Sequence, residues 1–222
     1  MSRPQPIVVG PEALAQRSAE WLAEAIRQTL ARGGRCSFAL SGGKTVGPIY
    51  RILAAMPLPW EQVDFYFADE RCVPPDHLES NYFLADENLF RPAGVKLDKV
   101  RRMQGEREDR DAAARDYEAL LPPTLDIVLL GMGEDGHTAS LFPGLEAVEE
   151  RERRVLAVVG PKPPPWRLTL TLPVLVGARK VLFAVAGEGK KDALRRVLAG
   201  EDLPAARVTN AVWIVDRAAA GQ

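Results

Sequence analysis

Apolar runs of strand length alternate with segments of helical spacing along this chain, and this alternation constrains its fold most strongly. Strands are expected at residues 36–40, 63–68, 125–130, 155–159, 168–172, 181–186 and 212–215, and helices at 11–32, 46–55, 80–90, 109–121 and 190–198. Several of these strands are apolar on both faces, which is typical of a parallel sheet covered by helices on both sides. The sequence therefore predicts an α/β fold with a single doubly wound, mainly parallel β-sheet and helices on both faces. We expect one domain spanning residues 1–222.

Composition excludes several other classes. The 222 residues are 46% hydrophobic and 27% charged, as in ordinary globular proteins. A net charge of −1 argues against a general nucleic-acid binder. The chain has only two cysteines, Cys36 and Cys72, and two histidines, so a four-cysteine zinc site is impossible and zinc-finger spacing is absent. We predict no metal site and free thiols at both cysteines.

No apolar run approaches the roughly 20 residues that cross a bilayer. Residues 1–10 also lack the apolar stretch of a signal peptide. We therefore expect a soluble cytoplasmic protein with no membrane partner.

Four polar clusters follow predicted strands, at residues 41–45, 69–71, 131–137 and 187–191. The carboxyl ends of parallel strands meet at one edge of a sheet, where ligands of open α/β folds bind. The four clusters are therefore predicted to share one pocket.

The first cluster, Ser41–Thr45, reads Ser-Gly-Gly-Lys-Thr and has the character of a phosphate-binding turn. Glycines let the backbone approach an anion, and the following helix offers free N–H groups. The spacing does not fit a Walker A motif. The alternative is a tight connection with no ligand. Ser41 is also a weak candidate for a hydrolase nucleophile, because the Gly-x-Ser-x-Gly elbow is absent.

The third cluster places Asp135 two residues before His137. Histidine titrates near neutral pH and suits general-base work, and a neighbouring carboxylate can hold its tautomer or contact substrate. The alternative is a helix start capped by Asp135, with His137 exposed. The other histidine, His77, is best explained as a surface residue of a loop.

Basic residues near the other strand ends are candidate anion ligands. Arg71 follows Asp69, and its planar guanidinium can bind a phosphate or carboxylate in a bidentate manner. An internal ion pair within residues 69–71 is the alternative. Arg167 and Lys190 can likewise contact an anion or be solvated surface charges.

Together these clusters resemble the 6-phosphogluconolactonase branch of the glucosamine-6-phosphate isomerase superfamily. The resemblance runs in order from about residue 10 to residue 216. The motifs that carry it are Leu40-Ser41-Gly42-Gly43, Asp69-Glu70-Arg71 with Ser80-Asn81-Tyr82, Gly131-x-Gly133-x-Asp135-Gly136-His137 continuing to Pro143, Arg167-Leu168-Thr169-Leu170-Thr171, and Gly187-x-x-Lys190.

Position 142 separates the lactonases from their relatives. In the isomerase/deaminase group a glutamate follows the motif histidine by five residues and is associated with proton transfers that open the sugar ring. Phe142 occupies that position here, and a phenyl ring cannot transfer protons. A deaminase-like enzyme and a non-catalytic sugar-phosphate binding protein stay as alternatives. A related group of transcription regulators needs a DNA-binding segment, for which residues 1–35 leave no room.

The resemblance implies hydrolysis of 6-phospho-D-glucono-1,5-lactone to 6-phospho-D-gluconate. It implies no metal, no organic cofactor, no nucleic acid and no obligatory protein partner. His137 is the expected base, Asp135 orients it or binds a hydroxyl, and Arg71 serves the phosphate or the oxyanion. Backbone N–H groups of a helix after His137 are the other expected oxyanion donors. The expected substrate-binding residues are Ser41, Gly42, Gly43, Thr45, Asp69, Arg167 and Lys190.

Overall fold

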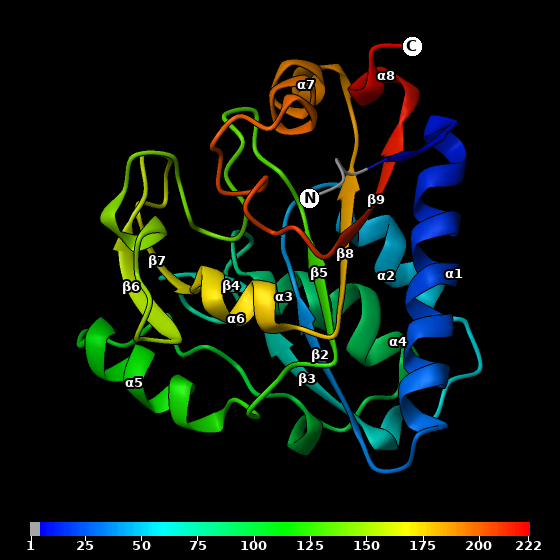
Figure 1. The fold of residues 1–222 in the computed structure, drawn as a ribbon. Coiled ribbons are helices and arrows are strands. Elements are labelled where there is room, and N and C mark those ends of the chain that lie inside the picture. The colour runs from blue at the N-terminus through cyan, green and yellow to red at the C-terminus, as the bar shows by residue number, and fades with distance from the viewer. Residues whose placement is uncertain (1–4) are drawn as a thin grey trace.

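A six-stranded parallel sheet forms the centre of the protein. The structure is a computed structural model, and it describes residues 5–222. The strands lie in the order β1-β9-β8-β5-β2-β3 (Figure 1). Their bounds are β1 (Ile7–Val9), β2 (Cys36–Leu40), β3 (Val63–Phe67), β5 (Ile127–Leu130), β8 (Lys180–Val185) and β9 (Ala211–Asp216). All of these strands pair in parallel.

Helices lie on both sides of this sheet, which confirms the expected fold class. In Figure 1, α1 and α2 cover one face, and α6 lies on the other. The helices are α1 (Pro11–Leu30), α2 (Val46–Ala54), α3 (Asn81–Ala85), α4 (Arg91–Ala93), α5 (Arg110–Leu120), α6 (Leu172–Gly177), α7 (Lys191–Ala199) and α8 (Arg217–Ala220). A π-helical segment, Asp86–Phe90, joins α3 to α4. The assignment of all 222 residues to one domain stays a prediction.

A second, antiparallel sheet was not predicted. It consists of β4 (Asp69–Arg71), β7 (Trp166–Leu170) and β6 (Val155–Val159), in that order. Residues 69–71 were expected only as the end of the preceding strand. The chain changes sheets at Ala68, whose N–H donates to the Leu40 carbonyl at 2.7 Å while its carbonyl accepts from Leu170 N–H at 2.8 Å. This exchange places Asp69 and Arg71 beside β7.

One further strand boundary and two short elements, β1 and α8, also differ from expectation. The strand expected to reach residue 172 ends at Leu170, and α6 begins at Leu172. Pro173 stands in the first turn of α6, where its missing N–H is not needed. Strand β1 and helix α8 are only a few residues long, too short for hydrophobic periodicity to identify.

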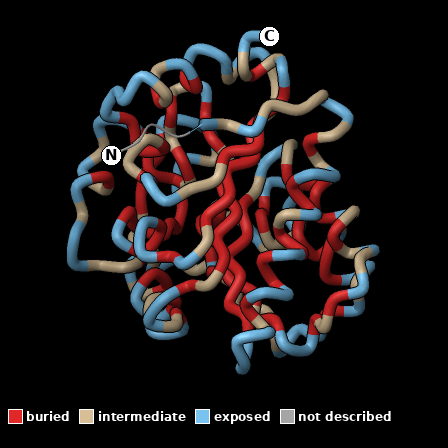
Figure 2. Tube along the Cα trace, turned by 45° about the vertical axis from the view of Figure 1, so that its right-hand side comes forward, coloured by how far each residue is buried: buried red, intermediate tan, exposed pale blue. Residues whose placement is uncertain are grey.

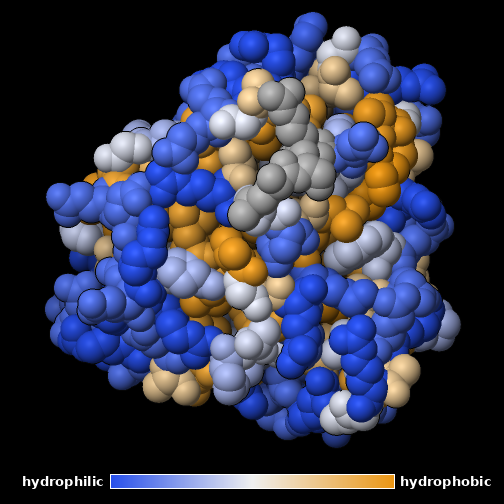
Figure 3. All heavy atoms as spheres, viewed as in Figure 1, coloured by the Kyte–Doolittle hydropathy of each residue, from blue (hydrophilic) through white to orange (hydrophobic). Residues whose placement is uncertain are grey.

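The parallel strands supply the buried core. Every residue of β2 and β5 is buried, and Figure 2 shows the buried segments concentrated in the central sheet. The rings of Phe183 and Trp213 stack with centroids 3.9 Å apart. On the face drawn in Figure 3, hydrophilic residues cover most of the periphery. Close packing of these strands makes the sheet a rigid base for the loops at its carboxyl edge.

Glu70 is a buried carboxylate that fixes the start of α3. It accepts hydrogen bonds from the backbone N–H groups of Arg71, Asn81 and Tyr82 and from the Ser80 hydroxyl, at 2.7–3.0 Å. Burial raises the pKa of Glu70 to about 7, although these hydrogen bonds oppose the rise. Its charge state therefore couples folding to pH.

The Glu70→Gln variant should show a weaker dependence of stability on pH. Because the folded state raises the pKa of Glu70, this group's contribution is fully present below about pH 4.5 and is lost as pH rises through about 7. The full change is on the order of 3 kcal/mol. Urea unfolding of both proteins between pH 4.5 and 8 measures it, with exposed Glu108→Gln as the matched control. Equal slopes for wild type and Glu70→Gln would refute the coupling.

Candidate active site

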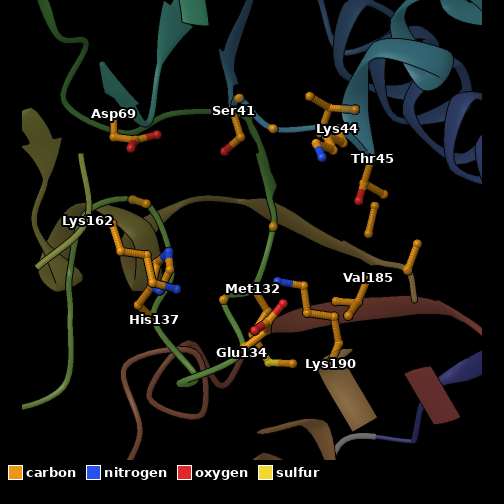
Figure 4. Close-up of a pocket in the computed structure, with 18 of the residues that line it drawn as sticks. Ser41, Lys44, Thr45, Asp69, Met132, Glu134, His137, Lys162, Val185 and Lys190 are labelled. Atoms are coloured by element: carbon orange, nitrogen blue, oxygen red, sulfur yellow. The ribbon is translucent and has the colours of Figure 1, made fainter. Parts of the chain in front are cut away.

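A cavity of about 430 Å³ opens at the carboxyl edge of the parallel sheet. After β2 the chain continues to β3 on one side, whereas β5 leads to β8 and β9 on the other, so the strand order reverses between β2 and β5. Such a switch point is where doubly wound folds bind ligands. Nine of the ten predicted site residues line the cavity: Ser41, Gly42, Gly43, Thr45, Asp69, Arg71, His137, Arg167 and Lys190 (Figure 4). The tenth, Asp135, is hydrogen-bonded to His137.

The turn from β2 to α2 forms one wall of the cavity. Gly43 has φ +101°, a backbone conformation that residues with a side chain rarely adopt. Thr45 precedes α2 and makes no capping hydrogen bond with its side chain, so its hydroxyl is available to a ligand. Helix α2 begins directly after this turn, and the positive end of a helix suits an anion.

Ser41 belongs to the framework of this turn. Its hydroxyl donates to the Leu129 carbonyl at 2.7 Å, and its carbonyl accepts from the Tyr50 hydroxyl at 2.6 Å. Ser41 is buried, and no imidazole contacts its hydroxyl in the described residues. These contacts argue against Ser41 as a nucleophile.

Asp135 and His137 form a tight pair at the end of β5. Asp135 Oδ1 lies 2.5 Å from His137 Nδ1 and also accepts the backbone N–H of His137 at 3.2 Å. Burial works to raise the pKa of Asp135, but hydrogen bonds and charge interaction with His137 outweigh it and lower the pKa. An ionised Asp135 accepts the Nδ1 proton, which leaves Nε2 of the neutral ring free to take another.

Gly133 makes room for this pair. A Cβ atom there would lie 2.0 Å from His137 Nδ1. The Gly133 N–H donates to the His137 carbonyl at 2.8 Å, which closes the loop. Gly133 therefore has a packing role that was not predicted from the sequence.

No helix follows His137, which corrects one expectation. Gly136 has φ +82° and Ala139 has φ +48°, so the backbone is left-handed at both positions and cannot continue as a right-handed helix. The chain instead makes a turn in which Leu141 N–H donates to the Thr138 carbonyl. The prediction of oxyanion donors at a helix start after His137 is therefore wrong. The alternative in which Asp135 caps that helix is wrong as well.

Phe142 lies close to both His137 and Arg167. Its ring centroid lies 4.3 Å from that of His137 and 5.5 Å from the guanidinium carbon of Arg167. Phe142 is buried. An apolar ring therefore stands at the position where the deaminase relatives were expected to carry a proton-transferring glutamate.

Asp69 is held from both sides at the start of β4. Its Oδ2 accepts from the Ser140 hydroxyl at 2.6 Å, and its Oδ1 accepts from Asn81 Nδ2 at 3.1 Å. All three residues are buried. The carboxylate thus has a fixed orientation at the cavity wall and retains free lone pairs for a substrate hydroxyl.

The basic residues concentrate positive charge in the cavity. Arg71 donates to the Glu79 carboxylate at 3.2 Å, rather than pairing within residues 69–71. Burial lowers the pKa of Arg167, and repulsion by Arg71 adds to this. Burial also lowers the pKa of Lys190, to which Lys162 contributes. Converging, partly desolvated cations are typical of a site for an anionic ligand.

Three charged residues of the cavity were not predicted as site residues: Lys44, Glu134 and Lys162. Lys44 and Glu134 lie inside motifs that were quoted, but no role was given to their charges. Lys162 lies in a proline-rich segment to which no function was assigned. No spacing rule connects that loop to the sheet edge, because it belongs to the second sheet.

Within residues 5–222 no group of three or more histidine, cysteine, aspartate or glutamate side chains is placed to hold a metal ion. Cys36 and Cys72 are free thiols. None of the helices in the described part of the chain is both long and apolar enough to span a bilayer.

The fold and the site together define a family. Residues 10–215 match the family model of the glucosamine-6-phosphate isomerases/6-phosphogluconolactonase, and the chain belongs to this family. A 6-phosphogluconolactonase of Rattus norvegicus is 38% identical over 246 residues, covering 99% of this chain and 95% of the relative.

Solved structures agree with this grouping. The 6-phosphogluconolactonase from Trypanosoma cruzi superposes with a TM-score of 0.89 at 31% identity, covering 100% of this chain and 98% of that one. The 6-phosphogluconolactonase from Thermotoga maritima gives a TM-score of 0.89 at 28% identity, covering 96% and 100%.

Proposed function

We propose that this protein hydrolyses 6-phospho-D-glucono-1,5-lactone to 6-phospho-D-gluconate, the second step of the oxidative pentose phosphate pathway. One observation carries the proposal: the Asp135–His137 pair faces a cation-lined cavity, with Phe142 where a second proton-transferring group would stand. The names of the relatives support the same reaction. Hydrolysis needs only water and a base, so the proposal includes no metal or organic cofactor. It also includes a cytoplasmic location and no nucleic-acid or protein partner.

The phosphate end of the substrate is assigned to the turn before α2. Backbone N–H groups of Gly42 and Gly43 and the Thr45 hydroxyl bind phosphate oxygens there. Lys190 and Arg167, which also line the cavity, supply formal positive charge. Ser41 contributes by holding the turn in place.

The lactone end is assigned to His137. Its Nε2 takes a proton from water as the water oxygen attacks the lactone carbonyl carbon, and the negative charge of Asp135 stabilises the imidazolium. Arg71 donates to the carbonyl oxygen as it becomes an oxyanion. The bond from the carbonyl carbon to the ring oxygen then breaks, and His137 returns the proton to that oxygen. Asp69 accepts a hydrogen bond from a sugar hydroxyl.

The wild-type protein should accelerate decay of the phosphorylated lactone above its spontaneous rate. The lactone is generated in place by glucose-6-phosphate dehydrogenase and its disappearance is followed after addition of the protein. A rate equal to the spontaneous background would refute the proposal in favour of a binding protein. Release of ammonia from glucosamine 6-phosphate would instead support a deaminase.

A further inference from the structure

Lys162 lies on a stiff arm that belongs to the second sheet. The arm is the loop of residues 160–165 between β6 and β7, and the Gly160 N–H closes it by donating to the Pro165 carbonyl at 2.7 Å. Four of its six residues are prolines, whose rings fix the backbone φ. Lys162 is exposed at the rim and also lines the cavity. Its position is therefore set by a rigid loop.

Arg167 fastens this arm to the cavity wall. Its Nη2 donates to the Lys162 carbonyl at 3.3 Å and its Nε donates to the Pro164 carbonyl at 3.2 Å. The same guanidinium lies over Phe142, which packs on His137. Gly160 also lies close to Phe142, since a Cβ atom at position 160 would lie 2.7 Å from the phenyl ring. The backbone of Lys162 is thus fixed relative to His137.

Lys162 and Lys190 bring like charges to one cavity. They come from separate elements, the β6–β7 loop and the loop before α7. Burial lowers the pKa of Lys190, and the positive charge of Lys162 lowers it further, whereas the carboxylates of Glu134 and Asp135 work against this. Two ammonium groups repel each other unless negative charge offsets them, and Glu134, which lines the same cavity, offsets only one of the two. The arrangement favours a ligand with at least one full negative charge at this position.

We propose that Lys162 is a substrate-binding residue whose ammonium group contacts the phosphate of the lactone opposite Lys190. This inference rests on the proposed function, and it adds a cation that the motifs do not contain. Arg167 gains a second role, because its hydrogen bonds to the loop carbonyls position Lys162. Residues positioned by both sheets then contact the phosphate.

The Lys162→Met variant tests this assignment with two substrates. We expect KM for the phosphorylated lactone to rise about 10-fold, the worth of one partly exposed charged hydrogen bond. We expect kcat to stay the same, and turnover of unphosphorylated gluconolactone to be unaffected. Lys162→Arg should retain most of the affinity. Lys96→Met removes an equal charge from an exposed site elsewhere and serves as the control.

Each other result overturns the assignment. An unchanged KM means that Lys162 is a solvated surface charge, and an equal loss on both lactones means that it does not read the phosphate. A fall in kcat alone places it at the oxyanion. Calorimetric binding of 6-phosphogluconate and of gluconate separates this inference from the proposed function. An inactive wild type would refute lactone hydrolysis, whereas the ratio of the two dissociation constants still decides whether Lys162 contacts phosphate.

Discussion

The His137→Ala variant should hydrolyse the phosphorylated lactone with kcat lowered by about 10²–10⁴-fold and with KM little changed. The imidazole is the group that removes the proton from water, whereas the phosphate contacts lie on the turn before α2. Its Nδ1 is already occupied by Asp135 at 2.5 Å, so only Nε2 can act as the base. Loss of the ring removes both the base and the acid that protonates the leaving oxygen.

The other histidine provides the matched control. His77 is exposed, and its ring accepts the Glu79 N–H at 3.0 Å outside the cavity. His77→Ala should therefore keep the wild-type kcat. Initial rates of lactone decay, corrected for spontaneous hydrolysis, give both values. Near-normal turnover by His137→Ala would remove this residue from the chemistry, and binding of 6-phosphogluconate by the same variant would show that its site is intact.

The parallel sheet and the position of its cavity could be predicted from the sequence for a physical reason. Buried strands such as β2 and β5 are apolar throughout, and their polar loops begin immediately at the carboxyl ends. Because those ends share an edge, motifs as distant as residues 41–45 and 131–137 were expected to meet, and they do. The roles of the individual residues stay predictions.

The features that could not be predicted from the sequence depend on tertiary contacts. The second sheet begins at Ala68, whose N–H donates to β2 while its carbonyl accepts from β7. No local sequence pattern marks such a change of sheet. The helix expected after His137 is absent because Gly136 and Ala139 are left-handed, and alanine gives no sign of that conformation. Lys162 was missed because tertiary contacts hold its loop at the cavity, among them the hydrogen bonds that Arg167 donates to the loop carbonyls.

Net charge was a poor guide to the ligand. The chain carries a net charge of −1, yet Lys44, Arg71, Lys162, Arg167 and Lys190 all line one cavity. Asp69 and Glu134 are the acidic residues of the same lining, so the basic residues outnumber them there. An anionic ligand responds to the local field, because the apolar sheet beneath the cavity screens charge less than water does.

The second large effect is expected for Gly42→Ala. A Cβ atom at this position would lie 1.7 Å from Asn81 Oδ1, a distance that no rotation of the alanine can relieve. Asn81 is buried, and its amide donates to the Asp69 carbonyl at 2.8 Å and to the Asp69 carboxylate at 3.1 Å. Asn81 is thus held in place, so the added methyl group must displace the phosphate turn, Asp69 or both.

Displacement of about 1 Å in a binding site can cost about 10²-fold. We therefore expect kcat/KM of Gly42→Ala to fall by about 10²-fold for the phosphorylated lactone, and stability to fall by about 1–3 kcal/mol from overpacking. Gly177→Ala is the matched control, because a Cβ there meets no atom within 4 Å and its φ is not positive. Lactone kinetics and urea unfolding measure both quantities. Wild-type kinetics for Gly42→Ala would show that the turn does not need a glycine here. Recovery in Gly42→Ala combined with Asn81→Ala would identify the clash as the cause, since the second substitution removes the atoms that the methyl group meets.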